Sequence, residues 1–257
     1  MQVYALSGLI NFVSAFSMAI FVYRKKPNLK KYIYLNLSVA AWGLSYFLWQ
    51  ISSSAFWAGL FFKFVVASII ISPIIFLLFC YEFAEVNRYK YIFIFDIVMC
   101  FSLLSINTFT NLIVSRLDSI LLFEYWPMAG PLLPLYFVYF IINLGLGYLV
   151  LLKKSARKKR SNWILAATVI GYLGAATNFF LWYGIKIPPI GNISATIYVF
   201  IMAYSIMRHR VLEVSFALSN IFSRILTVSF LAVIYWFIST SLNYYDFFKT
   251  PYIPSPK

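Results

Sequence analysis

Asp96 lies within an apolar stretch, YIFIFDIVMCF, where an ionisable side chain is unusual. A carboxyl group in such surroundings loses solvation, so it is a candidate for ligand contact or proton transfer. Snorkelling toward a lysine or arginine at the end of the stretch is the structural alternative. Hydrolysis or group transfer would also require a paired carboxylate, a histidine cluster or a nucleophile beside a base, and Asp96 stands alone in its segment.

The other reactive side chains are just as isolated. His209 is the single histidine, and the adjacent Arg208 and Arg210 disfavour its protonation. Cys80 and Cys100 fall in separate apolar segments without a CxxC or Cys/His pattern, so we interpret them as buried small residues. HExxH, GxSxG and glycine-rich phosphate-binding motifs are absent from the sequence. The sequence therefore predicts a protein that is not an enzyme, with no catalytic residue, no metal site and no cofactor.

Uncharged amides in apolar segments are the remaining polar candidates. Asn178 follows Ala167, Gly171 and Ala175, whose spacing of four creates a small-residue stripe that lets another helix approach closely. Its amide should therefore point into protein, toward an interhelical hydrogen bond or toward a ligand. Residues of the same kind are Asn11, Asn36, Gln50 and Asn143. The candidate ligand-binding residues are Asp96, Asn143 and Asn178.

The composition requires a membrane to position these residues. The chain is 63% hydrophobic and 11% charged, with a mean hydropathy of +0.85, and a soluble globule of this length could not bury that much apolar surface. The net charge of +14 comes from short basic clusters between apolar stretches, and this pattern reports topology and anionic lipid contact rather than nucleic-acid binding. The lipid bilayer is thus the expected partner, and nucleic acid is not.

Eight stretches approach the length of about 20 apolar residues that a transmembrane helix needs. They are Tyr4–Tyr23, Tyr32–Ile51, Phe61–Phe83, Tyr91–Ile106, Leu132–Leu152, Trp163–Tyr183, Ile187–Met207 and Ile225–Leu242. The expected fold class is an all-α polytopic membrane helical bundle of seven transmembrane helices plus an eighth. The expected organisation is a seven-helix domain at 1–214, a cytoplasmic linker at 215–224, the eighth helix at 225–242 and a short tail at 243–257.

Basic residues set the expected orientation. All but five of the 21 lysines and arginines lie in the first, third, fifth and seventh connections, which the positive-inside rule places in the cytoplasm. The N-terminus is therefore expected outside the cell membrane. The five exceptions are Lys63, Arg116, Lys186, Lys249 and Lys257. With eight spans the C-terminal tail lies outside, whereas with seven everything after Met207 is cytoplasmic.

Two connections on the expected outer side have distinctive sequences. The segment from Asn107 to Pro131 is too apolar for a plain solvated loop, and we expect it to fold over the outer mouth of the bundle. An interfacial helix and a ligand lid are both compatible with it. Pro188 and Pro189, within GIKIPPIGN, are interpreted as the first turn of the seventh helix, where a missing N–H is tolerated.

The stretch TNFFLWYGIKIPPIGNISATIYVFIMAYSIMRHRVLEVS, Thr177 to Ser215, resembles the end of the N-terminal seven-helix sensor region of bacterial histidine kinases. Shared features are an Asn-bearing sixth helix, an outer turn with Pro-Pro and Gly, and an exit similar to Tyr-x-Ile-x-Arg-x-Arg-Leu-x-Asp. EYWPMAGPLLPLYFVYF also resembles the start of the family's fifth helix. The resemblance implies a signal-exit segment formed by Tyr204, Arg208, His209, Arg210 and Glu213.

The resemblance implies a sensory input module in the bacterial inner membrane that detects an unknown small or apolar ligand or the membrane state. A kinase output domain is not recognisable after Glu213, so a fragment, a truncated gene and a subunit with a separate signalling partner all remain open. The alternative function is a small transporter or channel component that uses Asp96.

Overall fold

The computed structural model describes residues 2–87, 90–154 and 158–210, which form a bundle of helices and one β-hairpin. In chain order the elements are α1 (Gln2–Lys25), α2 (Lys30–Gln50), α3 (Ala55–Ala84), α4 (Lys90–Phe109), β1 (Val114–Ile120), β2 (Phe123–Ala129), α5 (Leu133–Lys154), α6 (Lys158–Ala176), α7 (Asn178–Trp182), the 3-10 helix η1 (Ile190–Ile193) and α8 (Ser194–Arg210). Glu213 and the expected eighth span, linker and tail lie outside the described residues.

Five helical segments in these ranges are long and apolar enough to cross a membrane. They are Tyr4–Lys25, Ala55–Ala84, Lys90–Phe109, Leu133–Leu152 and Asn162–Trp182, and each coincides with a stretch predicted from the sequence. Helix α2 has a comparable length, but tyrosine, tryptophan, asparagine and glutamine side chains make it less apolar. Helix α8 has 17 residues, which leaves it shorter than a typical span. The all-α class and the multi-pass membrane character are thus confirmed.

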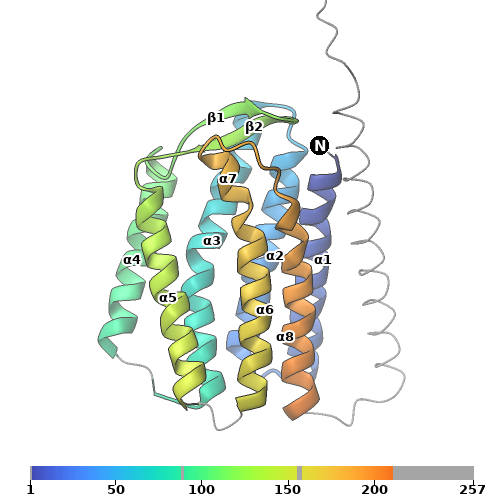
Figure 1. Cartoon of the computed structure of the whole chain (residues 1–257), viewed down its shortest axis with the longest axis vertical. Helices are drawn as coiled ribbons and strands as arrows, with labels where there is room; N and C mark the ends of the chain where they lie inside the picture. The colour runs from blue at the N-terminus through green and yellow to red at the C-terminus, as the bar shows by residue number, and fades with distance from the viewer. Residues whose placement is uncertain (1, 88–89, 155–157, 211–257) are drawn as a thin grey trace, which may run out of the picture. The chain divides into compact units, whose positions relative to one another are not determined.

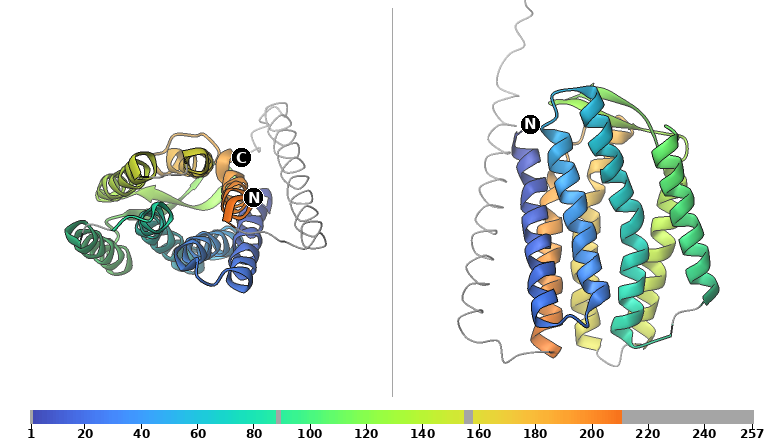
Figure 2. Two further views of the ribbon diagram at one scale, coloured as in Figure 1. Left: turned by 90° about the horizontal axis from the view of Figure 1, so that it is seen from below. Right: turned by 180° about the vertical axis from the view of Figure 1, so that it is seen from behind.

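The long helices run side by side, with α1 packed on α2, α2 on α3, and α6 on α8 (Figures 1 and 2). Glycines allow the closest of these approaches. A Cβ atom added to Gly43 would lie 2.8 Å from the carbonyl oxygen of Gly8, so α1 and α2 touch through their backbones. A Cβ added to Gly171 would lie 2.8 Å from Cβ of Tyr198, so the small-residue stripe of α6 receives α8, as the sequence predicted.

The sixth and seventh predicted helices are each interrupted. Helix α6 ends at Ala176, and the short α7 begins at Asn178. Between them, the Thr177 hydroxyl donates a hydrogen bond to the Gly174 carbonyl at 2.7 Å. The expectation that Pro188 and Pro189 form the first turn of the seventh helix is wrong, because α8 begins at Ser194. They precede η1, and the N–H of Ile190 donates to the Pro188 carbonyl at 2.8 Å, so the chain turns before α8 begins.

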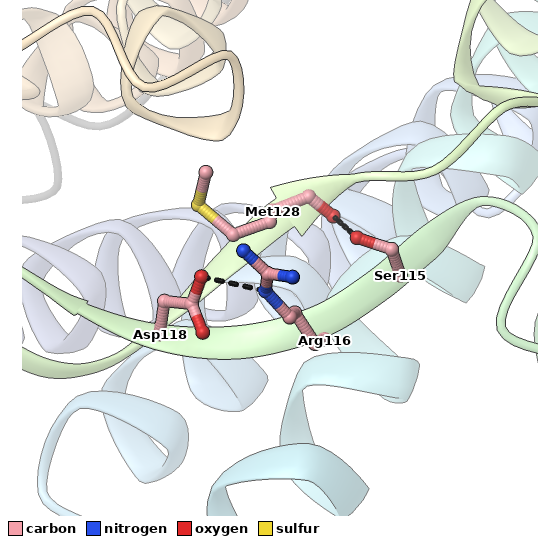
Figure 3. Close-up of polar contacts among 4 residues, drawn as sticks. All are labelled: Ser115, Arg116, Asp118 and Met128. Carbon is pink, nitrogen blue, oxygen red and sulfur yellow. Dashed lines mark hydrogen bonds and ion pairs between the residues drawn. The ribbon is translucent and has the colours of Figure 1, made fainter.

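The segment between α4 and α5 forms an antiparallel hairpin, β1–β2, across one end of the bundle (Figure 1). The interfacial-helix alternative for this segment is therefore wrong, and these short strands are an exception to the all-α expectation. On the hairpin, the Ser115 hydroxyl donates to the Met128 carbonyl at 3.2 Å, and Arg116 pairs with Asp118 at 2.7 Å (Figure 3). Both charged side chains are exposed, so this ion pair contributes little stability.

Aromatic side chains fasten the hairpin to the bundle. The indole N–H of Trp49, near the end of α2, donates to the Tyr125 carbonyl of β2 at 2.8 Å. The Trp49 ring also lies 4.8 Å from that of Trp126, which is completely buried. On the other side, Phe123 meets Tyr4 of α1 with a ring separation of 5.1 Å. The hairpin thus forms a packed roof over this end of the helices.

Candidate functional site

A cavity of about 240 Å³ lies between α2, α3, α5, α6, α7 and α8, and we call it the central cavity. Its aromatic lining residues are Trp42, Tyr46, Trp49, Phe62, Tyr136, Phe137, Phe140, Tyr172, Phe179, Trp182 and Tyr198. Smaller side chains, among them Ser68, Gly171 and Ala175, leave the space that these rings surround. A concave, mostly apolar site of this kind is the usual form of a small-molecule pocket.

Ring-to-ring contacts fix part of this lining. Phe62 of α3 lies 4.7 Å from Trp49 and 5.1 Å from Trp182, with both pairs close to edge-on. Phe179 meets Trp182 at 4.9 Å within α7. Edge-to-face pairs at these separations add packing energy beyond burial. The end of the cavity nearest the hairpin therefore has rigid aromatic walls contributed by three helices.

Four polar atoms in the lining residues lack a hydrogen-bond partner among the described residues. They are the hydroxyls of Tyr46 and Tyr198, the Nε1 of Trp182 and the Oδ1 of Asn178. Each of these residues is more than nine-tenths buried. A buried donor or acceptor without a partner costs about 1–3 kcal/mol, which a ligand with matching groups would recover.

Among the described residues that line the central cavity, none is a lysine, arginine, histidine, aspartate or glutamate. A charged ligand would lose its hydration there without gaining an opposite charge, which is costly in a medium of low polarity. The arrangement therefore suits a neutral molecule.

Asn178, a candidate from the sequence, lies at the edge of the cavity in a network of polar side chains. Its Nδ2 donates to Oδ1 of Asn192 at 3.2 Å, and the Nδ2 of Asn192 donates to the Ser7 hydroxyl at 2.7 Å. Asn11 completes the network, donating to the Asn192 carbonyl at 3.0 Å and accepting from Thr196 at 2.6 Å. The network joins α1, α7, η1 and α8. The Nδ2 of Asn178 thus takes part in helix packing, while its Oδ1 has no partner among the described residues.

Sequence reasoning missed Asn192, the centre of this network. Its position in PPIGNIS, directly after two prolines and a glycine, indicated only a turn. Its partners Ser7 and Asn11 are more than 180 residues away in the chain. Only the packing of η1 against α1 brings these side chains together.

Asp96 and Asn143 form a second polar site, on α4 and α5. The Nδ2 of Asn143 donates to Oδ1 of Asp96 at 3.2 Å and to the Tyr139 carbonyl at 3.0 Å. Both residues are buried, and the Oδ2 of Asp96 and the Oδ1 of Asn143 have no partner among the described residues. Neither residue lines the central cavity, so the three candidates from the sequence divide between two places.

The expected exit segment begins in the last turns of α8. Tyr204, Arg208, His209 and Arg210 belong to this helix, whereas Glu213 lies outside the described residues. Ala195 and Tyr198, closer to the start of α8, line the central cavity. One helix thus connects the cavity wall to the segment that carries the basic residues.

Comparison with protein families gave a match that covers most of the chain. The family model of the N-terminal 7TM region of histidine kinase matches residues 5–215, which include all the described helices apart from the first turn of α1. Comparisons with curated proteins and with solved structures found no match. The chain therefore belongs to the family of N-terminal seven-transmembrane regions of histidine kinases, the membrane sensory modules of these signalling proteins.

Proposed function

We propose that residues 1–214 act as a sensory input module that binds a small ligand in the central cavity and passes the signal through α8. The observation that carries this proposal is the neutral, aromatic central cavity with unpartnered polar atoms in its wall. Membership of a family of histidine-kinase input modules supports it. Asn178 is the candidate from the sequence that lies at this site.

The position of α8 supplies the mechanism. Ala195 and Tyr198 line the cavity, and the same helix continues to Tyr204 and Arg208 in the exit segment. Gly171 of α6 holds Tyr198 in tight contact, so a change in cavity occupancy would displace α8 rather than a single side chain. A ligand shifts the signalling state only by its difference in affinity for the two positions of α8.

The proposal includes seven transmembrane helices, with the N-terminus outside. Helices α2 and α8 run alongside the five long apolar helices, which supports counting both as spans (Figure 1). The ends of α1, α5 and α8 carry basic residues and lie at the end of the bundle opposite the hairpin. The positive-inside rule then places that end in the cytoplasm and the hairpin outside.

The test uses a chimera in which the output region of a histidine kinase follows Val214. Ala175→Leu fills part of the central cavity, and we expect it to change autophosphorylation in proteoliposomes by roughly tenfold, since a bias of about 1.4 kcal/mol is enough. The matched control is Ala166→Leu, an exposed position on the same helix that does not line the cavity. Equal autophosphorylation in wild type and both variants, at equal membrane abundance, would overturn the proposal.

A second candidate function is a small transporter or channel component that uses Asp96. The observation favouring it is the pair of buried unpartnered oxygens, Oδ2 of Asp96 and Oδ1 of Asn143. Buried ionisable groups of this kind mark ion or proton pathways in other membrane proteins. Proton or sodium flux in proteoliposomes that disappears in Asp96→Asn would support this function, and flux equal to empty vesicles would exclude it.

A further inference from the structure

We propose that the central cavity takes an uncharged, membrane-soluble molecule, a ring with a short apolar substituent and one hydroxyl group, which enters from the lipid between α5 and α6. The inference rests on the proposed function only in treating the central cavity as a ligand site. Four properties of the cavity carry it: its charge, its size, the placement of two polar atoms and the position of its exposed edge.

Charge and size limit the ligand. The described residues that line the cavity include no charged side chain, so an ionised ligand would be left without a counter-ion. An apolar cavity of roughly 150 Å³ can hold benzene. The central cavity, at about 240 Å³, therefore has room for one ring together with a short alkyl chain or a second ring.

Two side chains of α7 offer partners for a polar group of the ligand. Asn178 and Trp182 are four residues apart, so their side chains lie on the same face of the helix. The Oδ1 of Asn178 can accept a hydrogen bond and the Nε1 of Trp182 can donate one, and both lack a partner among the described residues. A hydroxyl group donates one hydrogen bond and accepts others, so it has the chemistry to pair with either atom once that side chain turns toward the cavity.

The exposed edge of the cavity indicates the route. Of the described lining residues, only Ile141 of α5 and Ala176 of α6 are exposed, and Ile141 is 64% exposed. Helices α5 and α6 also pack against each other much less extensively than α6 packs against α8. At the hairpin end, by contrast, the buried Trp49 and Trp126 close the bundle.

The surface around this edge is apolar. Val138 and Ile142 of α5 and Leu173 of α6 are large, exposed side chains close in sequence to the two edge residues. Such a surface on a membrane protein is covered by lipid rather than by water. A ligand that dissolves in the bilayer would therefore meet the opening directly, and its membrane concentration would determine occupancy.

The test uses the full chain in lipid nanodiscs and three matched probes: 4-butylphenol, the charged 4-butylbenzoate, and butylbenzene, which has no hydroxyl group. Binding is measured by thermal shift and by tryptophan fluorescence, with empty nanodiscs as the blank. We expect 4-butylphenol to bind at least roughly tenfold more tightly than 4-butylbenzoate. Trp182→Phe should weaken 4-butylphenol binding by roughly threefold to tenfold and leave butylbenzene within about twofold.

The route is tested by rates. Ala176→Phe places a large side chain at the exposed edge, so the association and dissociation rates of 4-butylphenol should both fall while the dissociation constant changes little. Ala166→Phe, an exposed position on the same helix away from the cavity, should leave both rates unchanged. Wild-type rates in Ala176→Phe would overturn the lipid route, and equal binding of phenol and benzoate would overturn the ligand class.

These outcomes separate the inference from the proposed function. If 4-butylphenol binds as expected but Ala175→Leu leaves the chimera unchanged, the sensory function fails and the ligand class stands. If the chimera responds to Ala175→Leu but wild-type protein binds the phenol no better than the benzoate, the ligand class fails and the sensory function stands.

Discussion

Asp96 and Asn143 show how a costly residue is accommodated in an apolar helix. The buried residues of α4 are Asp96, Cys100, Leu103 and Asn107, which recur at helical spacing and form one stripe facing protein. Asp96 thus lies on the protein side of a helix whose remaining surface is largely exposed, and Asn143 donates to it at 3.2 Å. In the described part of the chain its partner is an amide, rather than the lysine or arginine of the snorkelling alternative.

A double-mutant cycle measures this pairing. Asn143→Leu removes the donor and leaves the Asp96 carboxyl group buried alone, so we expect the free energy of unfolding to fall by about 1–3 kcal/mol. Adding Asp96→Leu should restore most of that loss, because two apolar side chains have no unpaired group to bury. Unfolding is followed by circular dichroism in mixed micelles. Strictly additive single and double substitutions would show that the two residues are not coupled.

At the scale of elements, the hairpin is the least expected feature. Hairpin turns usually contain glycine or asparagine because they need a positive φ, yet this turn contains Leu121 at φ 53° followed by Leu122. Those two leucines read as part of an apolar segment rather than as a turn. The hairpin is held by contacts with distant helices, such as the bond from Trp49 to Tyr125, which local sequence cannot reveal.

Trp49→Phe tests this anchoring. The substitution keeps a ring beside Trp126 and Phe62 but removes the 2.8 Å bond to the Tyr125 carbonyl. We expect the hairpin to lose about 0.5–1.5 kcal/mol of local stability, seen as faster hydrogen exchange of β1 and β2. Trp57→Phe, at an exposed position on α3, should have no such effect. Equal acceleration throughout the bundle would indicate global destabilisation instead.

The breaks in the sixth and seventh predicted helices lie beside one close backbone contact. Gly174 and Gly191 touch through their backbones, since a Cβ on Gly191 would lie 2.6 Å from the Gly174 carbonyl oxygen. That close approach occurs where α6 gives way to α7 and where η1 precedes α8. Hydropathy identifies both segments as apolar, but it does not reveal where a backbone contact interrupts a helix.

For the whole molecule, the charge pattern predicts which end of the bundle faces the cytoplasm. Among the described residues, the basic ends of α1, α5 and α8 lie at the end of the bundle opposite the hairpin (Figure 1). Lys63, Arg116 and Lys186 fall in the part of the described chain near the hairpin end, and they are three of the five exceptions to the basic clusters. Orientation is therefore a property of the entire chain rather than of a single helix.

Reporter fusions test this orientation. At the hairpin turn, between Leu121 and Leu122, an inserted reporter enzyme that works only outside the membrane should be active. After Lys154, a reporter that works only in the cytoplasm should be active. The positive-inside rule is the reason for both expectations. Protease protection in sealed vesicles provides an independent measurement. Exchanged activities at the two positions would reverse the proposed topology.

The sequence by itself determined the membrane location, the family and most helix positions, because hydropathy, the distribution of charge along the chain and motifs can be read without knowing how the helices pack. It also singled out Asp96, Asn143 and Asn178, because a polar residue within an apolar segment can be recognised from the sequence alone. All three side chains are buried, and their role in ligand binding stays a prediction.

Only the tertiary structure decided which of these residues lie together. Asp96 and Asn143 are 47 residues apart, and Asn192 lies 181 residues from Asn11, so their contacts depend on how α4, α5, α1 and η1 pack. The central cavity likewise forms from six helices, none of which carries a motif for it. A cavity is the space that several packed surfaces leave between them, and no single segment of sequence encodes it.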